Sequence, residues 1–177
     1  MPRIFWFVLA AMLAAWLGMN LVTVPRIEAA AGGLRLLDMR FTGYTQVEVK
    51  EFVAALGDEG TALYLGAQFW LDMIFPPLLG AVIFFFFRWL FPGLAGLVIG
   101  IVSMTYVATD ILENLAVAKI LRAGADGLTH EMAATANMWT LSKWRLSLVG
   151  LTMLLVGIVL RLRRRRVSRK PAKRQDQ

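Results

Sequence analysis

The stretch that decides the fold is GLAGLVIGIVSMTYVATDILENLAVAKIL, residues 93–121. It is mostly apolar and long enough to cross a bilayer as a helix, because about 20 residues at 1.5 Å each span ~30 Å of hydrocarbon. Asp110, Glu113 and Asn114 interrupt it. Ionisable side chains at membrane depth are costly, so they indicate either a functional site or a bond that holds helices together.

Three similar apolar blocks lie elsewhere in the chain. Its 177 residues are 58% hydrophobic with a mean hydropathy of +0.62, whereas a soluble domain is usually about 45–50% apolar. We therefore predict an all-α protein with a single membrane domain, residues 1–160, that forms a four-transmembrane-helix bundle. The expected spanning helices are residues 4–24, 62–87, 94–118 and 139–160.

The first block has the flanks of a signal peptide, since Arg3 precedes it and Ala29 to Ala31 follow it. Its apolar core runs from Ile4 to Val24, whereas the core of a signal peptide is usually ~7–15 residues long. We expect this helix to be retained, and its cleavage stays open. The chain has no cysteine, which excludes disulfides and Cys-bound zinc but does not fix the compartment.

Positive charge is concentrated after the last apolar block. The formal net charge is +7, and residues 161–177 form a basic tail. Basic residues next to a spanning helix are retained on the cytoplasmic side, so we expect a multi-pass protein of the cell (inner) membrane with both termini in the cytoplasm. We interpret the tail as a topology anchor attracted to anionic lipids. Docking of nucleic acid or protein is the less favoured alternative.

The longest connection, residues 25–61, faces outward in this orientation and contains one more predicted helix. Thr45 and Glu48 have the spacing of a capping box, in which each side chain bonds to the backbone of the other residue. An apolar face at helical spacing follows, made of Val49, Phe52, Val53 and Leu56. We predict an amphipathic helix over residues 46–56, ended by Gly57, that lies across the outer mouth of the bundle.

Helical depth and facing bring the polar residues together. In antiparallel neighbours, Asp72 and Asp110 each lie about eight residues, or ~12 Å, below the same surface, and Lys143 lies about one turn below it. Small residues share the face of Asp110 and Asn114, which marks a packed interface. Glu113 is roughly 60–100° away from that face, so it could face another neighbour or the lipid headgroups.

The pattern predicts a polar pocket in the outer half of the bundle. Its expected members are Tyr64, Gln68, Asp72, Asp110, Glu113, Asn114 and Lys143. Two or three acids share one inward lysine, so full pairing fails unless an acid is protonated, a cation binds, or Glu113 turns to water. Asp72, Asp110 and Glu113 are candidate ligands for a divalent cation such as Mg²⁺ or Ca²⁺, because hard cations prefer oxygen ligands.

Three functions remain open at this point. We favour a non-enzymatic membrane protein, of unknown specific activity, whose pocket binds a cation, a proton or a small ligand. The alternatives are a membrane-embedded enzyme that acts on a lipid and a purely structural subunit held by an internal ion pair. The chain has no Gly-rich phosphate loop, no GxSxG elbow and one histidine, which excludes zinc sites built on several histidines. Assembly as a homo-oligomer or with a membrane partner stays open.

Three short motifs carry a family resemblance. They are Tyr64 with Leu71-Asp72 and Phe75-Pro76, then Asp110-x-x-Glu113-Asn114, then Thr140-x-x-Lys143-Trp144. Over residues 41–160 this pattern resembles an uncharacterised family of four-helix bacterial integral membrane proteins. The resemblance implies a four-helix membrane fold but no activity, because none is established for that family. Its motifs coincide with the predicted pocket.

Overall fold

The computed structural model describes residues 1–168, with side chains for residues 1–163. Every regular element within these residues is helical. Four helices are long and apolar enough to cross a membrane, namely Arg3–Ala30, Gln46–Leu90, Leu94–Gly127 and His130–Arg163. The prediction of an all-α protein with four such helices is therefore confirmed.

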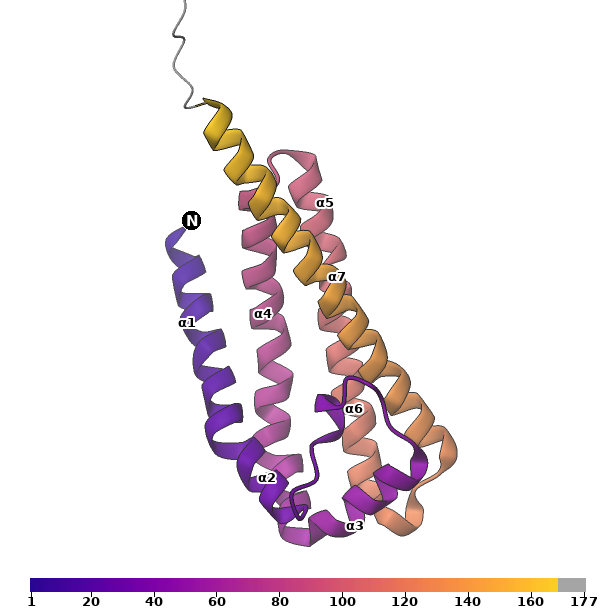
Figure 1. The fold of residues 1–177 in the computed structure, drawn as a ribbon. Coiled ribbons are helices and arrows are strands. Elements are labelled where there is room, and N and C mark those ends of the chain that lie inside the picture. The colour runs from indigo at the N-terminus through magenta and orange to yellow at the C-terminus, as the bar shows by residue number, and fades with distance from the viewer. Residues whose placement is uncertain (169–177) are drawn as a thin grey trace, which may run out of the picture.

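The first three long helices are divided by short irregular turns. In chain order the elements are α1 (Arg3–Gly18), η1 (Met19–Thr23), α2 (Val24–Ala30), η2 (Leu37–Met39), α3 (Gln46–Leu63), η3 (Tyr64–Gln68), α4 (Phe69–Leu90), α5 (Leu94–Val102), α6 (Met104–Gly127) and α7 (His130–Ser168). The turns η1 and η3 are π-helical, and η2 is a 3₁₀ turn. The long helices are thus not straight, and α3 lies across the end of α4 rather than in line with it (Figure 1).

The helices extend further than the apolar blocks indicate. The predicted span 139–160 lies inside α7, which begins at His130 after Thr129 Oγ1 accepts from the Met132 N–H at 3.2 Å. α7 continues to Ser168, so the first part of the predicted tail is helical, whereas residues 169–177 lie outside the described part of the chain. Hydropathy marks only the section of a helix that suits lipid, so polar helix ends escape it.

α4 stands in the middle of the molecule (Figure 1). It packs against α1 on one side and against α5 and α6 on the other, while α7 runs along α6 and crosses α4. The N-terminus and the turn between α4 and α5 lie at one end of the molecule. The connection 31–45, together with α2 and α3, lies at the opposite end, which we call the loop end.

The buried core is concentrated at the loop end. Its side chains come from α2, α3, α6, α7 and the connection 31–45, and the most deeply buried include Ile27, Leu36, Leu37, Val49, Phe52 and Ile120. Towards the other end, large apolar side chains are exposed, since Leu94 on α5 is 74% exposed and Leu148 on α7 is 66% exposed. Extended apolar surface of this kind fits contact with lipid rather than with water.

The start and the bend of α3 follow from its sequence. The predicted capping box is present, because the Thr45 N–H donates to Glu48 Oε2 at 2.7 Å and the Glu48 N–H donates to Thr45 Oγ1 at 3.3 Å. Gly57 has φ 63° and ψ −173°, a conformation that glycine adopts at little cost. This residue separates the helical stretch 46–56 from the stretch 58–63.

Candidate functional site

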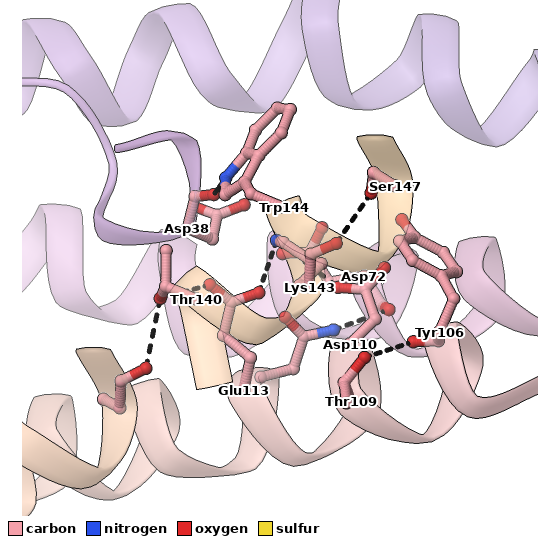
Figure 2. A network of polar contacts seen from close by, with 12 residues as sticks. Asp38, Asp72, Tyr106, Thr109, Asp110, Glu113, Thr140, Lys143, Trp144 and Ser147 are labelled. Carbon is pink, nitrogen blue, oxygen red and sulfur yellow. Dashed lines mark hydrogen bonds and ion pairs between the residues drawn. The ribbon is translucent and has the colours of Figure 1, made fainter. Parts of the chain in front are cut away.

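Lys143 on α7 supplies the cation of a buried polar cluster (Figure 2). Its Nζ lies 3.5 Å from Asp110 Oδ1 and forms a closer ion pair with Glu113 Oε2. All three residues are buried, and Glu113 is 0% exposed. Both carboxylates lie on α6, so this arrangement joins α6 to α7.

The second oxygen of Glu113 is bound through a chain of hydroxyl groups. Thr140 donates to Glu113 Oε1 at 2.5 Å, and the hydroxyl groups of Tyr44 and Thr140 are 3.1 Å apart. Because the one Thr140 proton goes to the carboxylate, Tyr44 is the donor in its bond to Thr140. Burial raises the pKa of the Tyr44 hydroxyl well above its ordinary value, which keeps this donor protonated. The connection 31–45 is thereby tied to the ion pair.

Glu113 is more enclosed than its angular position on α6 indicates. The sequence left open whether it faces another neighbour or the headgroups, and in the structure it lies between α6 and α7 on Lys143. Asp110, Glu113, Asn114 and Val117 recur at i, i+3, i+4 and i+7, so they share one buried face of α6. Glu113 lies at the edge of that face, where α7 packs against α6 and covers it.

Asp72 on α4 has neutral hydrogen-bond partners. Gln68 Nε2 donates to Asp72 Oδ2 at 2.8 Å, and Asn114 Nδ2 donates to the backbone carbonyl of Asp72 at 2.8 Å. The hydroxyl of Thr23 donates in turn to Gln68 Oε1. Within residues 1–163 the Asp72 carboxylate takes part in no ion pair, in contrast to Asp110 and Glu113.

A small cavity lies beside Asp72. Its lining residues are Tyr64, Leu65, Phe69, Asp72, Asn114, Val117, Ala118 and Leu121. Its volume is about 10 Å³, which is room for about one water molecule. Most of the lining is apolar, so Asp72, Tyr64 and Asn114 provide its polar side chains.

Asp38 is a member of the site that the sequence pattern did not indicate. Asp38 lies in η2 (Figure 2). Its half-buried carboxylate accepts from the Tyr64 hydroxyl at 3.1 Å. Its backbone carbonyl accepts from Trp144 Nε1 at 3.0 Å. A single acid in a connection has no helical spacing from which the direction of its side chain could be predicted. The apolar pair Leu36-Leu37 before it was the one local sign that this connection is buried.

The seven predicted pocket residues fall into two linked groups. Lys143, Asp110 and Glu113 form the ion-pair group, whereas Gln68, Asp72 and Asn114 form an amide–carboxyl group. Tyr64 lies between the amide–carboxyl group and Asp38, because it lines the cavity and donates to Asp38. The two groups adjoin through the neighbouring residues Glu113 and Asn114 on α6.

The candidate metal ligands Asp72, Asp110 and Glu113 are not grouped as ligands. Among the described residues, no cluster of three or more His, Cys, Asp or Glu side chains could hold a metal ion. The ammonium group of Lys143 lies against two of these three carboxylates. It therefore occupies the place at which a cation would neutralise them.

Comparisons with known proteins give no match, whether with family models, with curated proteins or with solved structures. The chemistry of the site therefore rests on its own charge balance. Four carboxyl groups surround Lys143, and they belong to Asp38, Asp72, Asp110 and Glu113. One ammonium group neutralises only one of four carboxylates. Asp110 and Glu113 are buried and Asp38 and Asp72 are half-buried, so uncompensated charge on them is costly to the extent that water is excluded.

Proposed function

We propose that this chain is a non-enzymatic integral membrane protein whose Asp72 carboxyl group binds and releases a proton at membrane depth. The observation that carries this proposal is the difference between the acids. Lys143 is engaged by Glu113 and Asp110, whereas the partners of Asp72 are amides. An acid without a cationic partner in a membrane helix is relieved of its charge most simply by a proton.

The other acids have a structural role in this proposal. Lys143, Glu113 and Asp110 join α6 to α7, and the Thr140 and Tyr44 hydroxyl groups extend this connection to residues 31–45. The internal ion pair that the sequence left as an alternative function therefore becomes the frame that holds the proton site. Asp72 stands beside this frame and remains available for exchange.

The size of the cavity distinguishes between ligands. About 10 Å³ holds roughly one water molecule, which suits a proton carried by water or one small monovalent cation. A lipid headgroup is far larger, and Mg²⁺ keeps several of its own waters when it binds. The geometry therefore favours proton binding over a lipid-acting enzyme and over a divalent-cation site.

The topology in this proposal places the loop end outside the cell membrane. The residues 46–56 bury Val49, Phe52, Val53 and Leu56, and we propose that this stretch is an amphipathic helix that covers the proton site. Both termini then lie in the cytoplasm, with the basic tail near anionic headgroups. Single cysteines placed at Arg35 and at Gln177 of this cysteine-free chain test this, because an impermeant maleimide should label only the former in intact cells.

Infrared spectroscopy of the purified protein in lipid tests the proton site. A protonated carboxyl group has a C=O stretch that is separate from the amide bands and shifts in D₂O. We expect a pH-dependent band of this kind in the wild type and in Asp58→Asn, a control at an exposed acid. The band should be absent from Asp72→Asn.

Two further results bear on this proposal. Spectra of Asp72→Asn and the wild type that coincide at every pH would overturn it. Repetition of the titration in NaCl and in choline chloride identifies the ligand. A midpoint of the Asp72 band that falls in NaCl but not in choline chloride would mean that Na⁺ competes with the proton and would make the site a sodium site. An equal midpoint in both salts supports the proton.

A further inference from the structure

Two π-helical turns face each other next to Asp72. η1 packs against η3, and Gly66 within η3 has the non-helical angles φ −92° and ψ −105°. A π-helical turn re-aims side chains relative to a regular helix, and such turns are frequent at functional sites. Here they bring together Thr23 and Gln68, which are 4% and 1% exposed.

The contact between these two side chains fixes the orientation of an amide. Gln68 has one acceptor end, the carbonyl oxygen, and one donor end, the NH₂ group. The Thr23 hydroxyl donates to the oxygen, so the NH₂ group is turned to the other side. There it donates to Asp72 Oδ2 at 2.8 Å.

This orientation distinguishes the two oxygens of the Asp72 carboxyl group. Oδ2 accepts an N–H from Gln68, and a proton on Oδ2 in the same direction would place two hydrogens face to face. We infer that Thr23 is a positioning residue that, through Gln68, stabilises the Asp72 carboxylate and directs proton binding to Oδ1. This inference rests on the proposed function, and it adds the residues that set the pH at which Asp72 exchanges its proton.

Other charged and titratable groups also face Asp72 and contribute to its charge balance. They are Asp38 from the connection, Tyr64 from η3, Asp110 from α6, and Lys143 from α7, which is itself paired with Glu113. The polar group that faces it from the first long helix is Thr23, which acts through Gln68. Substitution of Thr23 leaves all five of those groups in place. It removes the bond to Gln68 and a longer one, at 3.3 Å, to the Met19 carbonyl of the same helix.

The test is the midpoint of the Asp72 carboxyl band in the infrared titration. In Thr23→Val the amide is free to turn its oxygen towards Asp72 and accept from the protonated form. We expect the midpoint to rise by about one pH unit, the size of one hydrogen bond to a charged group. Gln68→Leu removes the donor and should raise the midpoint by a similar amount, and the double variant should match Gln68→Leu, because Thr23 acts only through Gln68.

Two control variants separate positioning from general loosening of the fold. Thr23→Ser keeps the hydroxyl and should restore the wild-type midpoint. Thr152→Val removes an exposed hydroxyl that bonds to its own helix at the Leu148 carbonyl, and it should leave the midpoint unchanged. A residue that served packing alone would lower thermal stability without moving the midpoint.

The outcomes separate this inference from the proposed function. A midpoint that Thr23→Val does not move, or shifts that add in the double variant, would overturn the role of Thr23 and leave the proton site intact. A wild-type spectrum without any band that depends on Asp72 would overturn the proton site and this inference with it.

Discussion

Substitution of Lys143 by methionine removes the cation from the most buried part of the site. Glu113, which is 0% exposed, would lose its ion pair, and Asp110 would lose a partner at 3.5 Å. Loss of one partner from a buried ion pair typically costs about 3–5 kcal/mol, because the remaining charge is uncompensated. At about 2–4 °C per kcal/mol for a chain of this size, we expect the midpoint of thermal unfolding to fall by roughly 6–20 °C.

A double-mutant cycle with Glu113→Gln isolates the pair from the rest of the packing. Glu113→Gln alone leaves Lys143 with Asp110, so its cost should be smaller, about 2–3 kcal/mol. The double variant should be about as stable as Lys143→Met alone, because position 113 no longer carries an unpaired charge while buried Asp110 still lacks its cation. We expect a coupling free energy of about 2–4 kcal/mol between the two residues.

Thermal unfolding in detergent, followed by tryptophan fluorescence, measures all four proteins of this cycle. Lys119→Met is the matched control, because it makes the same substitution at an exposed lysine on α6, and it should change the midpoint little. Additive losses in the double variant, or a Lys143→Met protein as stable as the wild type, would refute the structural role of the ion pair.

Three further predictions concern the connection 31–45. Burial raises the pKa of Tyr44, so above pH ~10 the unfolded chain loses this proton while the folded chain keeps it. The free energy of unfolding should therefore fall above pH ~10, and it should fall less in Tyr44→Phe. Chemical denaturation at several pH values measures both. Trp144→Phe removes the donor to the Asp38 carbonyl and should speed tryptic cleavage within this connection. Gly43→Ala should cost about 1–2 kcal/mol more than Gly33→Ala in chemical unfolding: both residues have positive φ, but a Cβ at Gly43 would lie 2.6 Å from Asn137 Oδ1, whereas Gly33 has open space.

Each of these predictions has a result that contradicts it. An equal pH dependence in wild type and Tyr44→Phe would show that Tyr44 is not a buried donor. For Trp144→Phe the control is Trp70→Phe, at a residue that is 65% exposed, and equal cleavage rates in the two variants would dismiss the Asp38 contact. Equal stability of the two alanine variants would show that the connection relaxes around a side chain at Gly43.

The sequence predicted those features that depend on helical period and depth. The facing and depth of Asp110 and Lys143 follow from residue spacing along two antiparallel helices, and they meet in the structure. The capping box at Thr45 and the bend at Gly57 are local, so their residues suffice to specify them. Such features can be predicted because each is set by neighbours within a turn or two of the chain.

Other site residues could not be predicted in this way. Asp38 lies in a connection whose path is determined by tertiary packing, and its contacts with Tyr64 and Trp144 join segments far apart in the chain. Thr23 meets Gln68 only because two π-helical turns re-aim both side chains, and regular helical spacing does not contain that distortion. The burial of Glu113 depends on how many elements cover α6, which one helix cannot reveal.

The central claim is that Asp72 carries an exchangeable proton while the acids of the ion-pair group are held by Lys143. Carbon-13 NMR of protein labelled at the aspartate carboxyl carbon measures this directly, since the chemical shift of that carbon reports protonation at each residue. We expect one resonance that is absent from Asp72→Asn to keep its protonated position at neutral pH. An Asp72 resonance at the ionised position at neutral pH would contradict the account.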